Sequence, residues 1–419
     1  MKSIFIVAPY FPPSSMPPSQ RVRLIVQHAA ELGYFPTVFT VDPKFREEKQ
    51  DSWMLKLVGD KYNLVTVNCF DQNKTRKFKI GDIGLRMLPF LFLSVYKHVK
   101  KDKPSFILYP VPPWYILMIA PLIKKLTRIP YGIDFIDPWV HDLGPSERGF
   151  KKRMSQWIAR GIEKWTCNNA SIIYSVSQGI NDNLLARYPS LKNKTFIAVP
   201  YGAEQNDFDL VRDELIISIQ EKILIRYIGA IWLDCYPVLD GLMPALAQVS
   251  KECPLQIEFL GTSYAGESLA KSQLDKWMKE NQMRSFTTEN PLRVTYRKAV
   301  ELTLSSDVLL LIGGMLPYYA ASKLMGLLVS KKPFVAFVHK DSFPAKLLSE
   351  IGYPYVVTYS NTENDLPSKK NNELSEAIKK AINERQEFTG IDLSHPIIQE
   401  NTAYGMTKIF LDPITKLLS

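Results

Sequence analysis

The chain has 419 residues, 46% of them hydrophobic and 22% charged, a balance typical of a folded protein with more than one domain. The net charge of +10 is unevenly spread: residues 1–200 hold 29 Lys and Arg against 15 Asp and Glu, whereas the remainder holds 23 against 27. The four cysteines form no C-x-x-C pair, which argues against a zinc site or a disulfide framework and favours a reducing, cytoplasmic environment.

Short apolar runs alternate with helical patterns in two series along the chain. The first series predicts strands at residues 3–9, 35–41, 63–69, 105–110, 131–137, 171–177 and 195–200. The second predicts strands at residues 223–229, 255–261, 293–297, 307–313, 333–338 and 353–359. Amphipathic stretches between them predict helices at residues 19–34, 236–252, 322–332 and 371–386. No apolar run reaches 18 residues, so no transmembrane helix is expected.

This alternation predicts an α/β fold with two Rossmann-like, doubly wound domains that face each other across a cleft. A polar linker is expected at residues 199–216. The expected division is an N-terminal domain at 1–203, a C-terminal domain at 204–398 and a terminal helix at 399–419. Ligands of such sheets bind outside the carboxyl ends of the strands, so the loops there are the candidate sites.

The loop after the first strand, "APYFPPSSMPPSQRVRL", contains no glycine, which argues against a dinucleotide such as NAD or FAD. Its prolines predict a stiff loop that leads into a helix capped by Ser19. Arg21 then lies in the first turn of that helix, where a cation can meet an anionic ligand. The alternative is a surface charge on a rigid loop.

A second polar loop follows the strand expected at 131–137. It carries, in order, Asp134, Asp137, Trp139, His141 and Asp142. Asp137 can hold an acceptor hydroxyl or act as a weak base, or it can cap a helix that begins at Pro138. A lone histidine such as His141 is more often structural or solvated than catalytic.

The turn that opens the second domain contains Gly229, which permits a close backbone approach but has no cation beside it. Further along, Gly313 and Gly314 follow the strand expected at 307–313 and allow a sharp turn. Ser322 is then predicted to cap a helix whose free N–H groups, together with the Lys323 ammonium, suit a diphosphate. The alternative is an ordinary serine cap beside a solvated lysine.

The basic, aromatic region at residues 86–128 predicts amphipathic helices with lysine clusters at their ends. A solvated helix face is one interpretation, and contact with anionic lipid headgroups is the other. No nucleic-acid-binding motif accompanies the charge, so nucleic acid is not the expected partner.

Taken together, these motifs resemble those of retaining glycosyltransferases with the GT-B fold, in particular the family-4-like branch with a proline-rich first loop. "PYFPPSSMPPSQRVRLIVQHAAELGYFPTVFTV" resembles the N-terminal signature of that group, and "DFIDPW" is similar to its D-x-R-D-x-W segment. "IIYSVSQGINDNLL" and "FIAVPYGAEQNDF" resemble the elements that close the first domain. "ASKLMGLLVSKKPFVAF" is similar to the donor-site block, and the resemblance covers nearly the whole chain.

The resemblance implies roles for individual residues. Asp137 and Arg21 would be catalytic, and Asp134, Trp139 and His141 would lie on the acceptor side. The donor-binding residues would be Gly229, Gly313, Gly314, Ser322, Lys323, Leu324 and Gly326. The family's two acidic E-x7-E positions are Tyr318 and Gly326 here, and Ala230 and Ile136 stand where arginines are usual.

The first expectation is therefore a retaining, metal-independent glycosyltransferase without a cofactor. It would move a sugar from a nucleotide-sugar donor to a glycan or lipid-linked acceptor in cell-surface polysaccharide assembly, with peripheral contact between its basic half and an anionic membrane. The alternative is a catalytically inactive GT-B protein that binds or scaffolds. A GT-B epimerase is the third interpretation. It comes last because an epimerase needs a set of acid and base residues in the cleft, and only Asp137 and His141 are available.

Overall fold

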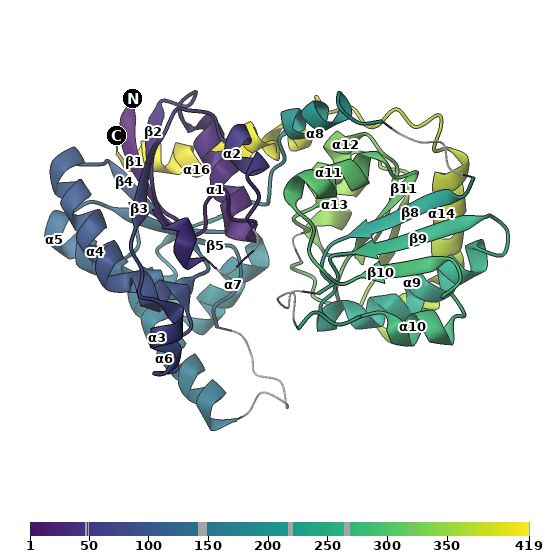
Figure 1. Ribbon diagram of the computed structural model, residues 1–419, viewed down its shortest axis with the longest axis horizontal. Helices are drawn as coiled ribbons and strands as arrows, with labels where there is room; N and C mark the ends of the chain where they lie inside the picture. Colours follow the sequence, from purple (N-terminus) through teal and green to yellow (C-terminus); the bar gives the residue numbers. More distant parts are fainter. Residues whose placement is uncertain are drawn as a thin grey trace. The chain divides into compact units, whose positions relative to one another are not determined.

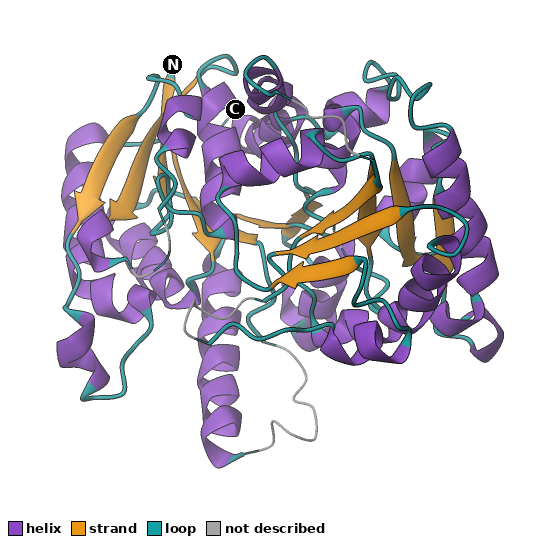
Figure 2. Ribbon diagram, turned by 45° about the vertical axis from the view of Figure 1, so that its right-hand side comes forward, coloured by secondary structure: helices purple, strands orange, loops and turns teal. Residues whose placement is uncertain are grey.

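The computed structural model describes residues 1–46, 48, 50–140, 149–216, 221–263, 269–319 and 321–418 (Figure 1). The chain divides into two compact units. Unit 1 comprises Met1–Pro200 together with Ala403–Ser419, and unit 2 comprises Tyr201–Thr402. Each unit is built around its own parallel sheet with helices on both faces (Figure 2), so the predicted pair of doubly wound α/β domains is confirmed.

Unit 1 contains a seven-stranded sheet in the order β3-β2-β1-β4-β5-β6-β7. Most of its strands are nearly continuous apolar runs, as expected for strands covered on both faces, whereas the edge strand β3 is largely exposed. They are β1 (Lys2–Val7), β2 (Tyr34–Val41), β3 (Asn63–Val67), β4 (Phe106–Val111), β5 (Tyr131–Phe135), β6 (Ile172–Ser175) and β7 (Thr195–Ala198). The α-helices of its first 200 residues are α1 (Pro17–Ala29), α2 (Trp53–Leu57), α3 (Gln72–Arg76), α4 (Ile83–Asp102), α5 (Ala120–Thr127), α6 (Phe150–Asn169) and α7 (Gln178–Arg187).

The C-terminal helix α16 (Ala403–Leu417) is part of the core of unit 1. Phe410 is fully buried, and its carbonyl oxygen accepts a 2.8 Å hydrogen bond from the hydroxyl of Tyr174 on β6. The Thr407 hydroxyl donates to the Leu24 carbonyl of α1 at 3.3 Å. The last residues of the chain therefore complete the unit that its first residues begin.

Unit 2 contains a six-stranded sheet in the order β10-β9-β8-β11-β12-β13. Its strands are β8 (Ile223–Ile228), β9 (Leu255–Leu260), β10 (Thr287–Asn290), β11 (Val308–Ile312), β12 (Phe334–His339) and β13 (Val356–Tyr359). Its helices are α8 (Gln205–Arg212), α9 (Tyr236–Val249), α10 (Asp275–Glu280), α11 (Tyr296–Leu304), α12 (Leu324–Ser330), α13 (Phe343–Glu350), α14 (Asn371–Asn383) and α15 (Pro396–Glu400).

One predicted strand of unit 2 is wrong, and the expected linker, where the two units do divide, also contains a helix. The strand expected at 293–297 does not form, because α11 begins at Tyr296 and the Thr295 side chain caps it by accepting a hydrogen bond from the Lys298 N–H. The strand of this region is β10 instead. Its sequence, TTEN, is polar and lacks the apolar pattern by which strands are recognised. The linker expected at 199–216 contains α8, whose Phe208 and Val211 are buried.

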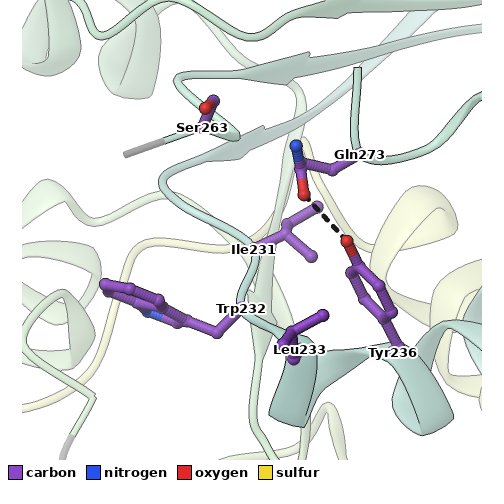
Figure 3. A pocket seen from close by; sticks show the side chains of 6 residues that line it. All are labelled: Ile231, Trp232, Leu233, Tyr236, Ser263 and Gln273. Carbon is purple, nitrogen blue, oxygen red and sulfur yellow. Dashed lines mark hydrogen bonds between the residues drawn. The ribbon is translucent and has the colours of Figure 1, made fainter. Parts of the chain in front are cut away.

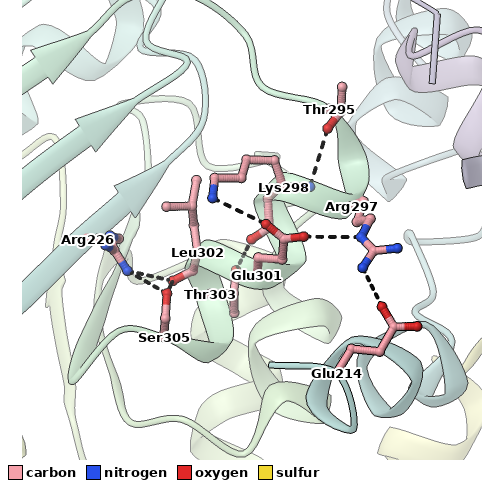
Figure 4. A network of polar contacts seen from close by, with 10 residues as sticks. Glu214, Arg226, Thr295, Arg297, Lys298, Glu301, Leu302, Thr303 and Ser305 are labelled. Carbon is pink, nitrogen blue, oxygen red and sulfur yellow. Dashed lines mark hydrogen bonds and ion pairs between the residues drawn. The ribbon is translucent and has the colours of Figure 1, made fainter. Parts of the chain in front are cut away.

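A buried arginine ties the edge of α11 to the sheet. Arg226 lies on β8, and its Nε donates to Glu258 on β9 at 2.7 Å. Its Nη1 donates to the Leu302 carbonyl at 3.1 Å and to the Ser305 hydroxyl at 2.9 Å (Figure 4). The charge is therefore neutralised and hydrogen-bonded, as burial requires, and this arginine is structural.

Candidate functional site

The carboxyl edge of the unit 2 sheet brings together loops that are far apart in the sequence. Strands β8, β11, β12 and β13 are parallel, so their carboxyl ends meet at one edge, the usual place for a ligand in a doubly wound sheet. Gly229 follows β8, and Gly313 and Gly314 follow β11. Glycine has no side chain to cover the backbone at these turns, so other groups can approach the backbone closely.

Lys323 makes such an approach. Its ammonium lies 4.6 Å from the centroid of the Tyr227 ring and 3.5 Å from the Tyr227 hydroxyl. A Cβ atom built on Gly229, whose φ is +152°, would lie 1.2 Å from the Lys323 Nζ. Burial lowers the pKa of Lys323 to about 8. In the sequence, Lys323 and Gly229 lie in separate candidate loops, and the fold brings their atoms into contact.

Asp234 organises the Gly313–Gly314 turn. Its Oδ2 accepts a 3.3 Å hydrogen bond from the Leu316 N–H, and its carbonyl accepts one from the Met315 N–H at 3.2 Å. A Cβ atom on Gly314 would lie 2.0 Å from the Asp234 Oδ2, which explains the glycine there. Burial raises the pKa of Asp234, while the hydrogen bonds from these N–H groups act in the opposite direction.

His339 ends β12 beside this turn and is only 3% exposed. Its Nδ1 accepts a hydrogen bond from the Asp341 N–H at 3.2 Å, which assigns the ring proton to Nε2. Within the described part of the chain, Nε2 has no hydrogen-bond partner. A buried donor without a partner suits an oxygen of a ligand. Sequence reasoning missed Asp234 and His339, because no motif marks either of them.

A cavity of about 200 Å³ lies at the same edge, beyond β8 and β9 (Figure 3). The Tyr236 hydroxyl donates to the Gln273 side-chain oxygen at 2.8 Å, and the Gln273 N–H donates to Glu289 at 2.8 Å. The amide at its rim is therefore held in a fixed orientation. Apolar walls with a few fixed polar groups suit a flat, polar-edged ring. The cavity is lined by Ile231, Trp232, Leu233, Tyr236, Ser263 and Gln273.

The start of α12 differs from the prediction. The helix begins at Leu324 with Lys323 at the N-cap position, and no side chain caps it. Ser322 is exposed and lies one residue before the cap, so the predicted serine cap is wrong. Leu324 is fully buried. A Cβ atom on Gly326 would lie 3.4 Å from the Phe208 ring of α8, so Gly326 lies at a helix contact.

In unit 1, the predicted catalytic Arg21 is fully buried. Its Nε and Nη2 donate to the two carboxylate oxygens of Asp134 at 2.7 Å and 3.0 Å, and Nη2 also donates to the Val199 carbonyl at 2.7 Å. The pair therefore joins α1, β5 and the chain after β7. Ser19 is not the cap of α1, because the helix begins at Pro17 after Met16.

The second loop of unit 1 is partly described. Asp137 is exposed, and no helix begins at Pro138, so the helix that Asp137 was predicted to cap does not form. Trp139 is buried and stacks on Trp114 with ring centroids 6.3 Å apart. His141 and Asp142 lie outside the described residues.

The described residues offer neither a cluster of metal ligands nor a membrane-spanning helix. No group of three or more His, Cys, Asp or Glu side chains is placed there to hold a metal ion. None of the described helices combines the length and the apolar character needed to cross a membrane.

Comparison with known proteins relates the chain to solved structures only. No protein-family model matches the sequence, and no curated protein sequence matches it. A glycosyltransferase from Rickettsia africae superposes with a TM-score of 0.62 at 12% identity, covering 100% of this chain and 99% of the other. HepE from Anabaena in complex with UDP-glucose gives 0.61 at 14% identity, covering 99% and 100%. UDP-GlcNAc 2-epimerase from Neisseria meningitidis, bound to UDP-GlcNAc, gives 0.52 at 13%, covering 99% and 100%.

These similarities extend over whole chains at low identity, so they establish the fold. The two-domain, Rossmann-like GT-B fold predicted from the sequence is confirmed. Glycosyltransferases and an epimerase share this fold, so the function must be argued from the site.

Proposed function

We propose that the protein is a glycosyltransferase that takes its sugar from a nucleotide-sugar donor bound at the carboxyl edge of unit 2. The observation that carries the proposal is the Lys323 ammonium against Gly229, a cation at a glycine turn where a phosphate can approach the backbone. The Asp234 and Gly314 turn lies at the same edge of the sheet.

Each part of a nucleotide-sugar has a matching feature in unit 2. The cavity lined by Tyr236 and Gln273 would take the base, with its flat apolar wall and fixed amide. Lys323 would neutralise the diphosphate and stabilise it as it leaves. The buried His339 Nε2–H would donate to a sugar or phosphate oxygen. These assignments use ordinary charge and hydrogen-bond complementarity, and they require no carboxylate at Tyr318 or Gly326.

The finer parts of the proposal rest on the family resemblance. They are retention of configuration, independence of a metal ion, and a glycan or lipid-linked acceptor in cell-surface polysaccharide assembly. On the acceptor side, Asp137 is an exposed carboxylate just after β5, available to an acceptor hydroxyl. Arg21 is better assigned to positioning than to catalysis, because Asp134 and backbone carbonyls occupy its guanidinium.

A thermal-shift screen against UDP, GDP, CMP and their sugars tests donor binding, because a ligand that binds only the folded protein raises the melting temperature. UDP-glucose and UDP-GlcNAc are the first probes, since HepE and the epimerase were each solved with one of them. Release of the nucleoside diphosphate in the presence of an acceptor would then support transfer. Conversion of UDP-GlcNAc to its C2 epimer would support the epimerase interpretation instead.

The second candidate is a GT-B-fold protein that binds but does not catalyse. It is favoured by the family's two acidic positions, which are Tyr318 and Gly326 here, and by the packing of Gly326 against Phe208. Absence of binding by every common donor, or binding without turnover for any acceptor, would support this candidate.

A further inference from the structure

Helix α6 carries a row of exposed apolar side chains along one side. Positions 150, 154, 157, 158 and 165 follow the i, i+4, i+7, i+8, i+15 spacing that falls on one face of an α-helix. Monomeric proteins rarely leave so many large apolar groups together in water. The exposed fractions are 79% for Phe150, 48% for Met154, 75% for Trp157, 39% for Ile158 and 40% for Trp165. We call these five residues the α6 stripe.

The α6 stripe is not the face by which the helix packs on unit 1. The packed face carries Ala159, Glu163, Thr166 and Cys167, all buried. The Glu163 carboxylate is held there by Arg187 at 2.7 Å and by the Tyr188 hydroxyl at 2.9 Å. The α6 stripe is therefore an apolar face that does not pack on unit 1. The N-terminal turns of α6 extend away from the other elements of unit 1 in both views (Figures 1 and 2).

The charges on α6 indicate the partner. Arg153, Arg160 and Lys164 are exposed beside the α6 stripe, and the sequence adds Lys151 and Lys152. Glu163 is the helix's sole acidic residue, and it is buried and paired. The exposed charges whose side chains are described are therefore all positive. Aromatic side chains beside lysine and arginine, without exposed acid, are typical of helices that lie in the interface of an anionic bilayer.

The neighbouring helix α5 extends the same chemistry. The Lys124 Nζ on α5 donates to the Asn169 carbonyl at the end of α6 at 2.7 Å, so the two helices are joined. Leu122 and Leu126 of α5 are 43% and 52% exposed, one helical turn apart, with the exposed Lys125 between them. By contrast, within the fully described helix α4, Leu93 is the one large apolar side chain that is exposed, whereas Met87 and Leu91 are buried in the core.

We propose that α6 is the membrane-contact element of this protein. Its apolar stripe would lie at the boundary between headgroups and acyl chains, and its arginines and lysines would contact anionic headgroups. The sequence suggested lipid contact at residues 86–128, a region that contains α5; the larger group of exposed apolar side chains lies on the neighbouring helix α6. The proposal agrees with a lipid-linked acceptor, but it is independent of donor binding and survives if the proposed transferase activity fails.

Vesicle sedimentation with the full chain tests the proposal, using phosphatidylcholine vesicles with and without phosphatidylglycerol. We expect binding to the anionic vesicles at low salt and partial release at high salt. The double variant Phe150→Ser/Trp157→Ser should bind about tenfold or more weakly, because it removes two interfacial aromatic anchors. Arg153→Gln/Arg160→Gln should weaken binding chiefly at low salt.

Leu93→Ser is the matched control, because Leu93 is 65% exposed but lies on α4. It should bind like the wild type, and all variants should keep the wild-type melting temperature. Absence of wild-type binding, equal binding to neutral vesicles, or an equal loss in Leu93→Ser would overturn the proposal. So would sedimentation velocity showing a wild-type dimer that Phe150→Ser/Trp157→Ser dissociates, since the stripe would then bind a second copy of the chain.

Discussion

The ammonium of Lys323 occupies the space that a side chain on residue 229 would need. A Cβ atom on Gly229 would stand 1.2 Å from the Lys323 Nζ, so the glycine and the lysine depend on each other. This contact places a cation over the turn after β8, and it is the centre of the proposed donor site. The first three predictions follow from it.

Lys323→Ala should weaken binding of a nucleoside diphosphate by about 1.5–3 kcal/mol, the usual contribution of a hydrogen bond to a charged group. This corresponds to roughly a 10- to 150-fold loss of affinity by calorimetry. Lys279→Ala is the control, because Lys279 is an exposed lysine on α10 in the same unit. Equal affinities for the two variants would remove Lys323 from the site.

Gly229→Ala should reduce the same affinity, because the new methyl group must displace the ammonium. The displaced atoms end a flexible side chain, so the melting temperature should change much less than the affinity. Gly261→Ala is the matched control: it also has a positive φ, +71°, but its nearest neighbouring atom is 3.7 Å away. It should cost about 1–2 kcal/mol of stability without a specific loss of binding. The double variant Gly229→Ala/Lys323→Ala should bind no worse than the weaker single variant.

Nucleotide affinity should fall as the pH rises through about 8, since burial lowers the pKa of Lys323 to about 8. The sign follows from the charge: the protonated ammonium predominates below that pH and attracts the diphosphate, whereas the neutral amine above it does not. Lys323→Arg should abolish the alkaline fall, because a guanidinium stays protonated. Titration by calorimetry between pH 6.5 and about 9.5 checks this. A fall that persists unchanged in Lys323→Arg would assign the effect to another group.

Asp134→Asn should destabilise unit 1 by about 3–5 kcal/mol, because it leaves the Arg21 guanidinium buried without its counter-ion. Urea unfolding measures the loss, and Asp60→Asn, an exposed carboxylate in the same unit, should be neutral. The double variant Arg21→Met/Asp134→Leu should be more stable than Asp134→Asn. An unchanged unfolding midpoint in Asp134→Asn would contradict the structural role of the pair.

Asp137→Asn should lower the transfer rate by roughly 10²-fold or more if its carboxylate assists the acceptor hydroxyl. Donor affinity should stay at the wild-type value, since Asp137 belongs to unit 1 and the proposed donor site to unit 2. Steady-state kinetics combined with donor calorimetry separates the two effects. Unchanged turnover would exclude Asp137 from the reaction.

The sequence was most informative where local chemistry decides the structure. The apolar runs that became β1, β4, β11 and β12 are buried almost throughout, and a buried parallel strand needs no partner-specific pattern to be recognised. Prediction failed at β10, whose residues Thr287–Asn290 are polar, and at Thr295, whose capping role replaced a strand by α11.

The candidate site shows the same division. Glycines at the ends of strands and a lysine before a helix were recognised from the sequence, because turn geometry and charge are local properties. Asp234 and His339 were missed, since their roles depend on which loops the sheet order brings together. Arg21 was recognised as important, but only the fold revealed that its guanidinium is paired with the Asp134 carboxylate.

By itself, then, the sequence determined the two parallel α/β domains, the basic first half and the loops that end the strands. Hydrophobic periodicity, charge and turn residues can be recognised from neighbouring residues alone. Only the tertiary structure decided that Lys323 meets Gly229, that Arg21 is enclosed, and that α6 leaves its apolar side chains exposed. Contacts and exposure depend on residues distant in the chain, and packing alone brings those together.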